Sequence, residues 1–213
     1  MSEDSSIPEV KIGNQIWMAE NLNVDYFRNG DSIPNAITSD DWRYAADNEQ
    51  PAWCYYNNSH ANGLKYGKLY NWYAVDDPRG LAPEGWRIPT QADFAALITF
   101  LGGAEKAINK IKFNQNWKEG NKLINYFSFD WILYFLGYNK NVFNGLPGGH
   151  RFFDGDFWSI GTLGVWWCST LFKHYDTSAE SLFCVSTFIT DNFEIYKCTG
   201  VSVRCIKDDI LDI

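Results

Sequence analysis

Basic residues are scarce in this sequence, and their scarcity argues against a nucleic acid partner. Lysine and arginine together number 18, against 26 aspartate and glutamate residues, which leaves a formal net charge of −8. Proteins bind nucleic acids and anionic membrane surfaces through clusters of cationic side chains. Because this acidic chain has no such cluster, we expect no nucleic acid partner.

Long apolar runs are also missing. The sequence has no stretch of about 20 consecutive apolar residues, the length that a helix needs to cross a bilayer, so we expect a chain that does not span a membrane. The first ten residues, MSEDSSIPEV, contain neither the basic nor the apolar segment of a secretory signal. Two interpretations stay open: a cytosolic protein, or an exported domain whose leader has been removed. The polar start resembles a tether that follows a leader or a lipid-anchored cysteine.

Patterns typical of zinc binding are absent as well. The sequence has no Cys-x-x-Cys pair and its three histidines are scattered, so we expect no structural zinc site and predict no cofactor. Five cysteines allow at most two disulfides and one free thiol. They are Cys54, Cys168, Cys184, Cys198 and Cys205.

Aromatic residues, in contrast, are abundant. Ten tryptophans, 12 tyrosines and 15 phenylalanines make up 17% of the chain. This content is typical of a β-rich core, and it also suits recognition of sugars or peptides by stacking. No internal repeat or low-complexity linker divides the chain, so one domain is the default.

Strands are predicted at both ends of the chain. Apolar alternation over Val10–Met18, interrupted by Gly13-Asn14, predicts a hairpin with a glycine-first turn. We expect the segment Ile12–Met18 to pair with Val201–Ile206 in one sheet. The polar, turn-rich stretch from Asn29 to Ala61 predicts a long loop region, whereas the apolar segment 123–145 is ambiguous between a strand pair and a helix.

Two helices are predicted in the middle of the chain. Thr90 is a candidate N-cap with Asp93 three residues later, and Gly102-Gly103 ends the helix. The apolar residues that fall on one face of each helix are Phe94, Leu97, Ile98 and Leu101, then Ala104, Ala107, Ile108 and Ile111. Helices between terminal strands predict an α+β fold with antiparallel sheets.

Two further hairpins are predicted in the C-terminal third. The first turns at Asp154-Gly155. The second is predicted to turn at 190–192, which places Cys184 directly opposite Cys198 and makes these two cysteines candidates for a disulfide. An exported protein would form that bond, whereas a cytosolic one would keep both thiols free.

Five segments in order resemble one family, the Fibrobacter succinogenes major paralogous domain. They are VKIGNQIWMAENLNV, the long block from WCYYNNSHANG to GWRIPTQADFAALITFLGG, GLPGGHR, GVWWCST and SVRCIKD. The resemblance implies a C-type-lectin-like fold, distantly similar to formylglycine-generating domains, over 10–208. Residues 1–9 would then be a polar tether and 209–213 a tail. It also implies export, as a surface protein or lipoprotein of Bacteroidetes-type bacteria, and it carries over no catalytic residues.

The same resemblance makes the segment GVWWCST an inner strand. Trp166 and Trp167 are then expected on opposite faces, with at least one of them in the core. Arg151 is expected to be a structural hydrogen-bonding residue. Trp158, just beyond the Asp154-Gly155 turn, is expected to be exposed.

Calcium is an alternative to the absence of a cofactor, because lectins of this fold use oxygen-rich loops to bind it. Here the matching segments are incomplete: Pro34-Asn35 lacks the preceding acid or amide, and Asp191, Asn192 and Glu194 lack the tryptophan. Oxygen ligands at alternate positions can bind calcium, but solvated turns have the same composition.

The expected function is a non-enzymatic cell-surface or secreted domain that binds a carbohydrate or protein ligand. The candidate contacts are the aromatic residues Trp42, Tyr44, Trp131 and Trp158, because flat rings on loops stack on sugar faces. One alternative is a diverged enzyme, either an oxidase using Cys198 and Cys205 or a hydrolase, with Cys168 beside a histidine as the best nucleophile. The other alternative is a structural adhesin or fibre subunit.

Overall fold

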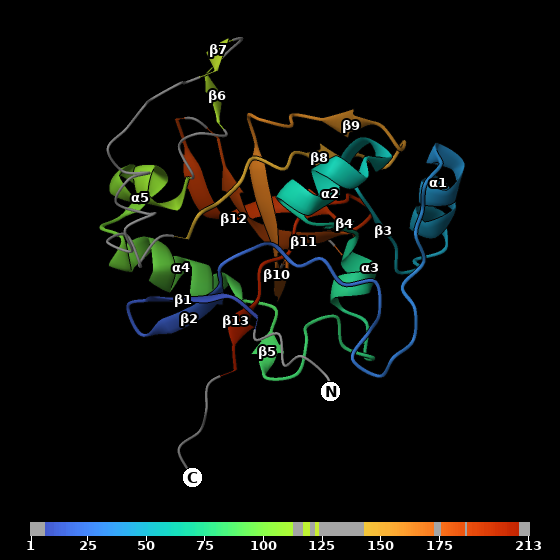
Figure 1. The fold of residues 1–213 in the computed structure, drawn as a ribbon, viewed down its shortest axis with the longest axis horizontal. Helices are drawn as coiled ribbons and strands as arrows, with labels where there is room; N and C mark the ends of the chain where they lie inside the picture. Colours follow the sequence, from blue (N-terminus) through green and yellow to red (C-terminus); the bar gives the residue numbers. More distant parts are fainter. Residues whose placement is uncertain are drawn as a thin grey trace.

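The structure is a computed structural model with mixed α and β elements (Figure 1). It describes residues 7–112, 117–119, 122–123, 143–172, 176–185 and 187–208. The helices are α1 (Ser39–Asp47), η1 (Tyr56–Asn58), α2 (His60–Tyr66), α3 (Trp72–Val75), α4 (Gln91–Phe100) and α5 (Ala104–Ile111). The strands are β1 (Glu9–Ile12), β2 (Gln15–Met18), β3 (Trp53–Cys54), β4 (Leu69–Tyr70), β5 (Trp86–Arg87), β6 (Lys118–Glu119), β7 (Lys122–Leu123), β8 (His150–Arg151), β9 (Phe157–Trp158), β10 (Gly164–Leu171), β11 (Ser178–Cys184), β12 (Ile189–Tyr196) and β13 (Ile206–Lys207).

The two ends of the chain meet in one four-stranded sheet, in the order β1-β2-β13-β5. β1 and β2 form the predicted hairpin, and Gly13 has a φ of 62° at its turn, where a glycine avoids the clash of a Cβ atom. Ile206 of β13 pairs with Trp17 of β2 in antiparallel register. The α+β fold class and the pairing of terminal strands are therefore confirmed, while the narrower C-type-lectin-like arrangement stays a prediction.

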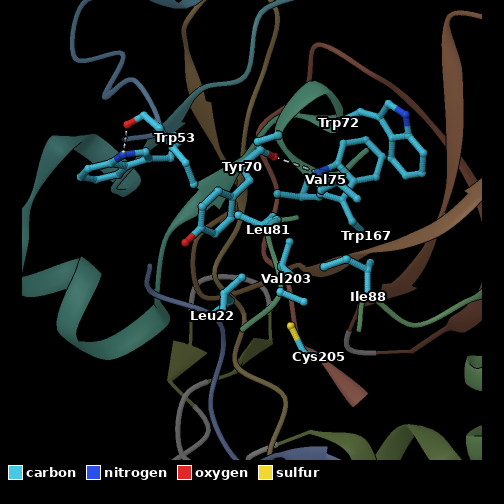
Figure 2. Close-up of a cluster of buried hydrophobic side chains, with 14 of the residues drawn as sticks. Leu22, Trp53, Tyr70, Trp72, Val75, Leu81, Ile88, Trp167, Val203 and Cys205 are labelled. Carbon is cyan, nitrogen blue, oxygen red and sulfur yellow. Dashed lines mark hydrogen bonds between the residues drawn. The ribbon is translucent and has the colours of Figure 1, made fainter. Parts of the chain in front are cut away.

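A three-stranded antiparallel sheet, β10-β11-β12, contributes residues to two of the three clusters of buried hydrophobic side chains among the described residues, one on each face. Trp166 and Trp167 are consecutive in β10, both fully buried, and point to opposite faces as predicted. The indole of Trp167 donates a hydrogen bond to the backbone oxygen of Tyr70 at 2.8 Å and packs edge-on against Trp72, as Figure 2 shows. On the other face, Trp166 belongs to the cluster of buried side chains that includes those of α4 and α5. Figure 1 shows these two helices and the central sheet.

Helices α4 and α5 begin and end where the sequence predicts. The Thr90 Oγ1 accepts from the backbone N–H of Asp93 at 3.2 Å, and an Asp93 carboxylate oxygen accepts from the backbone N–H of Thr90 at 2.7 Å. This capping box satisfies two donors that the first helical turn leaves free. The Arg87 guanidinium also binds the Asp93 carboxylate, which ties the helix to β5. No helix in the described part of the chain is both long and apolar enough to cross a membrane.

The prediction of a long loop over 29–61 is wrong, because this stretch contains α1, β3, η1 and the start of α2. Thr38 and Asp41 form a second capping box with the same spacing as Thr90 and Asp93. Trp42 and Ala45, three residues apart, then supply the buried face of α1. The sequence therefore carried a helix signal here, which the surrounding polar residues obscured.

The predicted register of the last hairpin is also wrong. The chain reverses direction between Cys184 and Ile189 rather than at 190–192, so Cys184 pairs with Ile189 and Tyr196 pairs with Ser178 at the far end of β11. Cys198 follows Tyr196, and the six-residue step from Ser178 to Cys184 separates the two cysteines by about 20 Å along the strand. They are not cross-strand neighbours, and all five cysteines are free thiols.

Candidate functional site

A short hairpin made of β8 and β9 lies at the opposite end of the molecule from β1 and β2 (Figure 1). Its register pairs His150 with Trp158 and Arg151 with Phe157, around the predicted Asp154-Gly155 turn. Side chains of directly opposed residues lie on the same face of a hairpin. The hairpin therefore has one face made by Arg151 and Phe157 and another made by His150 and Trp158.

The Arg151 face is buried and anchors the hairpin to the rest of the molecule. The Arg151 side chain is fully buried and donates hydrogen bonds to the backbone oxygens of Gly155 at 3.0 Å and Thr38 at 2.9 Å, and also to that of Ala36. Its guanidinium stacks 4.8 Å from the centre of the Trp42 ring. These contacts confirm the predicted structural role of Arg151.

The opposite face of the hairpin borders a cavity of about 360 Å³. Residues from the hairpin and its flanks, from all three strands of the central sheet, and from the segment after β12 line it. They are His150, Phe152, Leu163, Val165, Ser178, Phe183, Phe193, Glu194, Ile195, Tyr196 and Thr199. The cavity has the size of a small-molecule site.

Aromatic rings form much of the cavity wall. Phe183 and Phe193 come from neighbouring strands and stack with ring centres 4.1 Å apart and an angle of 27° between the planes. Phe193 and Tyr196 remain 38% and 54% exposed, so solvent reaches rings that line the cavity. Flat apolar surfaces are thus available to a ligand.

Polar groups without partners lie in the same wall. The Nδ1 of His150 and the hydroxyl oxygens of Ser178 and Thr199 are buried and have no hydrogen-bond partner within the described part of the chain. Burial lowers the pKa of His150 below its usual value of 6.5, so this imidazole is neutral at pH 7. Buried polar groups normally have partners, so these three groups are candidates for hydrogen bonds to a ligand, which would form once their side chains rotate toward the cavity.

The backbone holds Trp158 in a defined position next to this cavity. Gly149, with a φ of 67°, packs so closely that a Cβ atom there would lie 2.5 Å from the backbone oxygen of Trp158. Ser159 has a φ of 68°, a left-handed conformation that costs energy for residues other than glycine. Gly149, which precedes His150, and Ser159, which follows Trp158, therefore both have left-handed backbone conformations.

The predicted contact residues do not form one group. Trp158 is 55% exposed and lies beside the cavity through its pairing with His150. Trp42 is 1% exposed, because its ring packs beneath Arg151 in the core, so the prediction that it contacts a ligand is corrected to a supporting role. Tyr44 is 60% exposed. It lies two residues after Trp42 in α1, a rotation of about 200° around the helix axis, so its side chain points away from Trp42 and from the hairpin. Trp131 lies outside the described residues.

The sequence analysis did not identify the cavity residues Phe152, Phe183 and Phe193. For His150 a signal existed, because the Asp154-Gly155 turn already pairs it with Trp158. No local pattern points to Phe183 and Phe193, because they meet only through the register of β11 and β12.

The described residues offer few groups suited to nucleophilic catalysis or to metal binding. Burial raises the pKa of Cys168 and of Cys184 to about 12, whereas a reactive cysteine needs a lowered pKa. No cysteine lines the cavity. Within the described ranges, no group of three or more histidine, cysteine, aspartate or glutamate side chains is placed to hold a metal ion. Neither of the two segments considered for calcium is part of such a group within the described residues.

Comparisons with known proteins identify the family. The searches of curated proteins and of solved structures found no match. The family model of the Fibrobacter succinogenes major domain matches residues 10–207, which is almost the whole chain and agrees with the ordered segments of the sequence. The chain therefore belongs to the Fibrobacter succinogenes major domain family.

Proposed function

We propose that the protein is a non-enzymatic binding domain of the cell surface or the extracellular space, and that its ligand is a carbohydrate held in the cavity beside the β8–β9 hairpin. The observation that carries this proposal is the composition of the cavity wall. Stacked phenylalanine rings stand next to unpaired polar groups of His150, Ser178 and Thr199. Sugars combine apolar C–H faces with a rim of hydroxyl groups, and so match both features.

The polar groups decide between a sugar and an apolar protein side chain. A leucine or phenylalanine inserted into the cavity would cover the rings but leave the polar atoms of His150, Ser178 and Thr199 unpaired. Each buried polar group left without a partner costs about 1–3 kcal/mol. Sugar hydroxyls donate and accept hydrogen bonds, and a rotation of the Ser178 or Thr199 hydroxyl brings it toward such a ligand.

Two observations support binding rather than catalysis, one on the cavity wall and one on the buried thiols elsewhere. Glycoside hydrolysis usually needs two carboxyl groups that flank the scissile bond. Glu194 is the one acidic residue among those that line the cavity. The burial that raises the pKa values of Cys168 and Cys184 also leaves these thiols poor nucleophiles.

The fibre-subunit alternative has one observation in its favour. β12 is an edge strand of the central sheet, and edge strands can pair with another chain. However, the strand carries Asp191 and Glu194, and charges on an edge oppose the pairing of identical copies. The location at the cell surface is proposed from the resemblance of the sequence to exported family members.

The proposal is tested with a glycan array followed by calorimetry. The purified protein is expected to bind at least one glycan, and Phe193→Ala is expected to weaken that binding about tenfold through loss of a stacking ring. Tyr26→Ala is the matched control, because Tyr26 is 58% exposed and does not line the cavity. Thermal denaturation of both variants shows whether the fold is intact. An array without any bound glycan would contradict the proposal.

A further inference from the structure

We propose that the binding site continues from the cavity over the indole of Trp158, so that the preferred ligand is a glycan of at least two sugar residues. One residue occupies the cavity and the next stacks on Trp158. The inference rests on the proposed function and adds the length of the ligand and the role of one residue. It is carried by the position, the exposure and the backbone support of Trp158.

The position of Trp158 beside the cavity follows from the register of the hairpin. His150 lines the cavity, and Trp158 is its direct partner across β8 and β9. Directly opposed residues have Cβ atoms about 4.5–5.5 Å apart and project from the same face. The indole of Trp158 is therefore a neighbour of the cavity wall, outside the volume that the wall encloses.

Exposure sets Trp158 apart from the other tryptophans. Of the nine tryptophans in the described ranges, eight are buried, and only Trp158 is exposed, at 55%. The core therefore accounts for the other eight but gives no reason for a large indole at this position. A flat ring open to solvent beside a sugar-sized cavity is suited to stacking on a second sugar residue.

Close packing and buried hydrogen bonds hold the backbone that carries this ring. The close packing of Gly149 against the Trp158 carbonyl, the left-handed Ser159 and the buried hydrogen bonds of Arg151 all act on the same hairpin. A strained conformation persists only where the surroundings impose it. A platform that is already in place loses less conformational entropy when a ligand binds.

The phenylalanine pair and Trp158 consequently have separable roles. Phe183 and Phe193 contact the sugar residue inside the cavity, so their loss weakens ligands of every length. Trp158 contacts only the following residue, so its loss removes the gain in affinity that the second residue provides.

The test measures affinity against ligand length by calorimetry. The probes are neutral homo-oligosaccharides of glucose, mannose, galactose and N-acetylglucosamine, each from one to four residues long. For the series that binds, the dissociation constant of the wild type is expected to fall about tenfold from one residue to two, and to change little beyond that. Trp158→Ala is expected to remove this step and to leave the monosaccharide affinity within twofold of the wild type.

Two further variants make the outcome decisive. Tyr44→Ala, at an exposed ring on α1, should keep the step, and Phe193→Ala should weaken all lengths alike. Equal affinity for one and two residues in the wild type, or a step that survives in Trp158→Ala, overturns the extension over Trp158 and leaves the cavity proposal standing. Absence of binding at every length in all four series overturns both. Thermal denaturation confirms that Trp158→Ala is folded.

Discussion

Thr90 stabilises α4 through a hydroxyl that accepts a hydrogen bond from the backbone of Asp93. We predict that Thr90→Ala lowers the free energy of unfolding by about 1 kcal/mol, because the first helical turn loses this partner. Thr99→Ala is the matched control, since Thr99 is exposed on the same helix and only bonds back to the Ala95 carbonyl. Chemical denaturation measures the free energy of unfolding of both variants. A loss in Thr90→Ala no larger than that in Thr99→Ala would contradict the capping assignment.

The five thiols differ in exposure, and this difference predicts their order of reaction. Cys54, Cys168, Cys184 and Cys205 are buried, whereas Cys198 is partly exposed. Burial raises the pKa of Cys54 to about 12 and also raises that of Cys198, so access to reagent decides the order. We predict that iodoacetamide at pH 8 modifies Cys198 first in the native protein. Mass spectrometry of digested samples checks this.

The unfolded protein should react at all five cysteines without prior reduction. Protection of Cys184 and Cys198 together, removed only by a reductant, would show a disulfide and contradict the register of β11 and β12.

At the scale of elements, the hairpin β8–β9 depends on the close approach at Gly149. A Cβ atom there would lie 2.5 Å from the Trp158 carbonyl oxygen, whereas a Cβ atom at Gly30 would meet nothing within 4 Å. Both glycines have a positive φ. Gly30→Ala therefore measures the cost of the left-handed conformation alone, about 1–2 kcal/mol.

We predict that Gly149→Ala lowers the free energy of unfolding by at least about 1 kcal/mol more than Gly30→Ala does, because overpacking adds to the conformational cost. Urea denaturation of both variants provides the comparison. Equal losses would mean that the hairpin can shift, and that the position of Trp158 is not held by this contact.

Elements with a local chemical signal were predictable from the sequence. The capping box at Thr90 and the glycine turn at Gly13 each depend on residues a few positions apart. The placement of Trp166 and Trp167 on opposite faces of an inner strand followed instead from the resemblance to the family. The register of β11 and β12 was not predictable in either way, because the chain reverses between Cys184 and Ile189, several residues before the turn chosen from composition. The shift between Ser181 and Phe183 then alters the pairing by one more residue, and no local pattern marks it.

At the scale of the whole molecule, the candidate site depends on contacts between distant parts of the chain. The sequence correctly indicated an exposed Trp158, because the nearby turn determines its surroundings. It misjudged Trp42, since that ring is covered by Arg151, which is more than 100 residues away in sequence. The cavity itself combines the β8 hairpin with all three strands of the central sheet, and no single segment carries that information.

The central claim is that the cavity and Trp158 together form the ligand site. The most direct measurement is a two-dimensional NMR titration of the isotope-labelled protein with the glycan that binds best on the array. If both parts bind the glycan, chemical-shift changes are concentrated at His150, Phe193, Thr199 and the indole N–H of Trp158. Shift changes confined to α1 around Tyr44, or spread without any at the cavity residues, would contradict this claim.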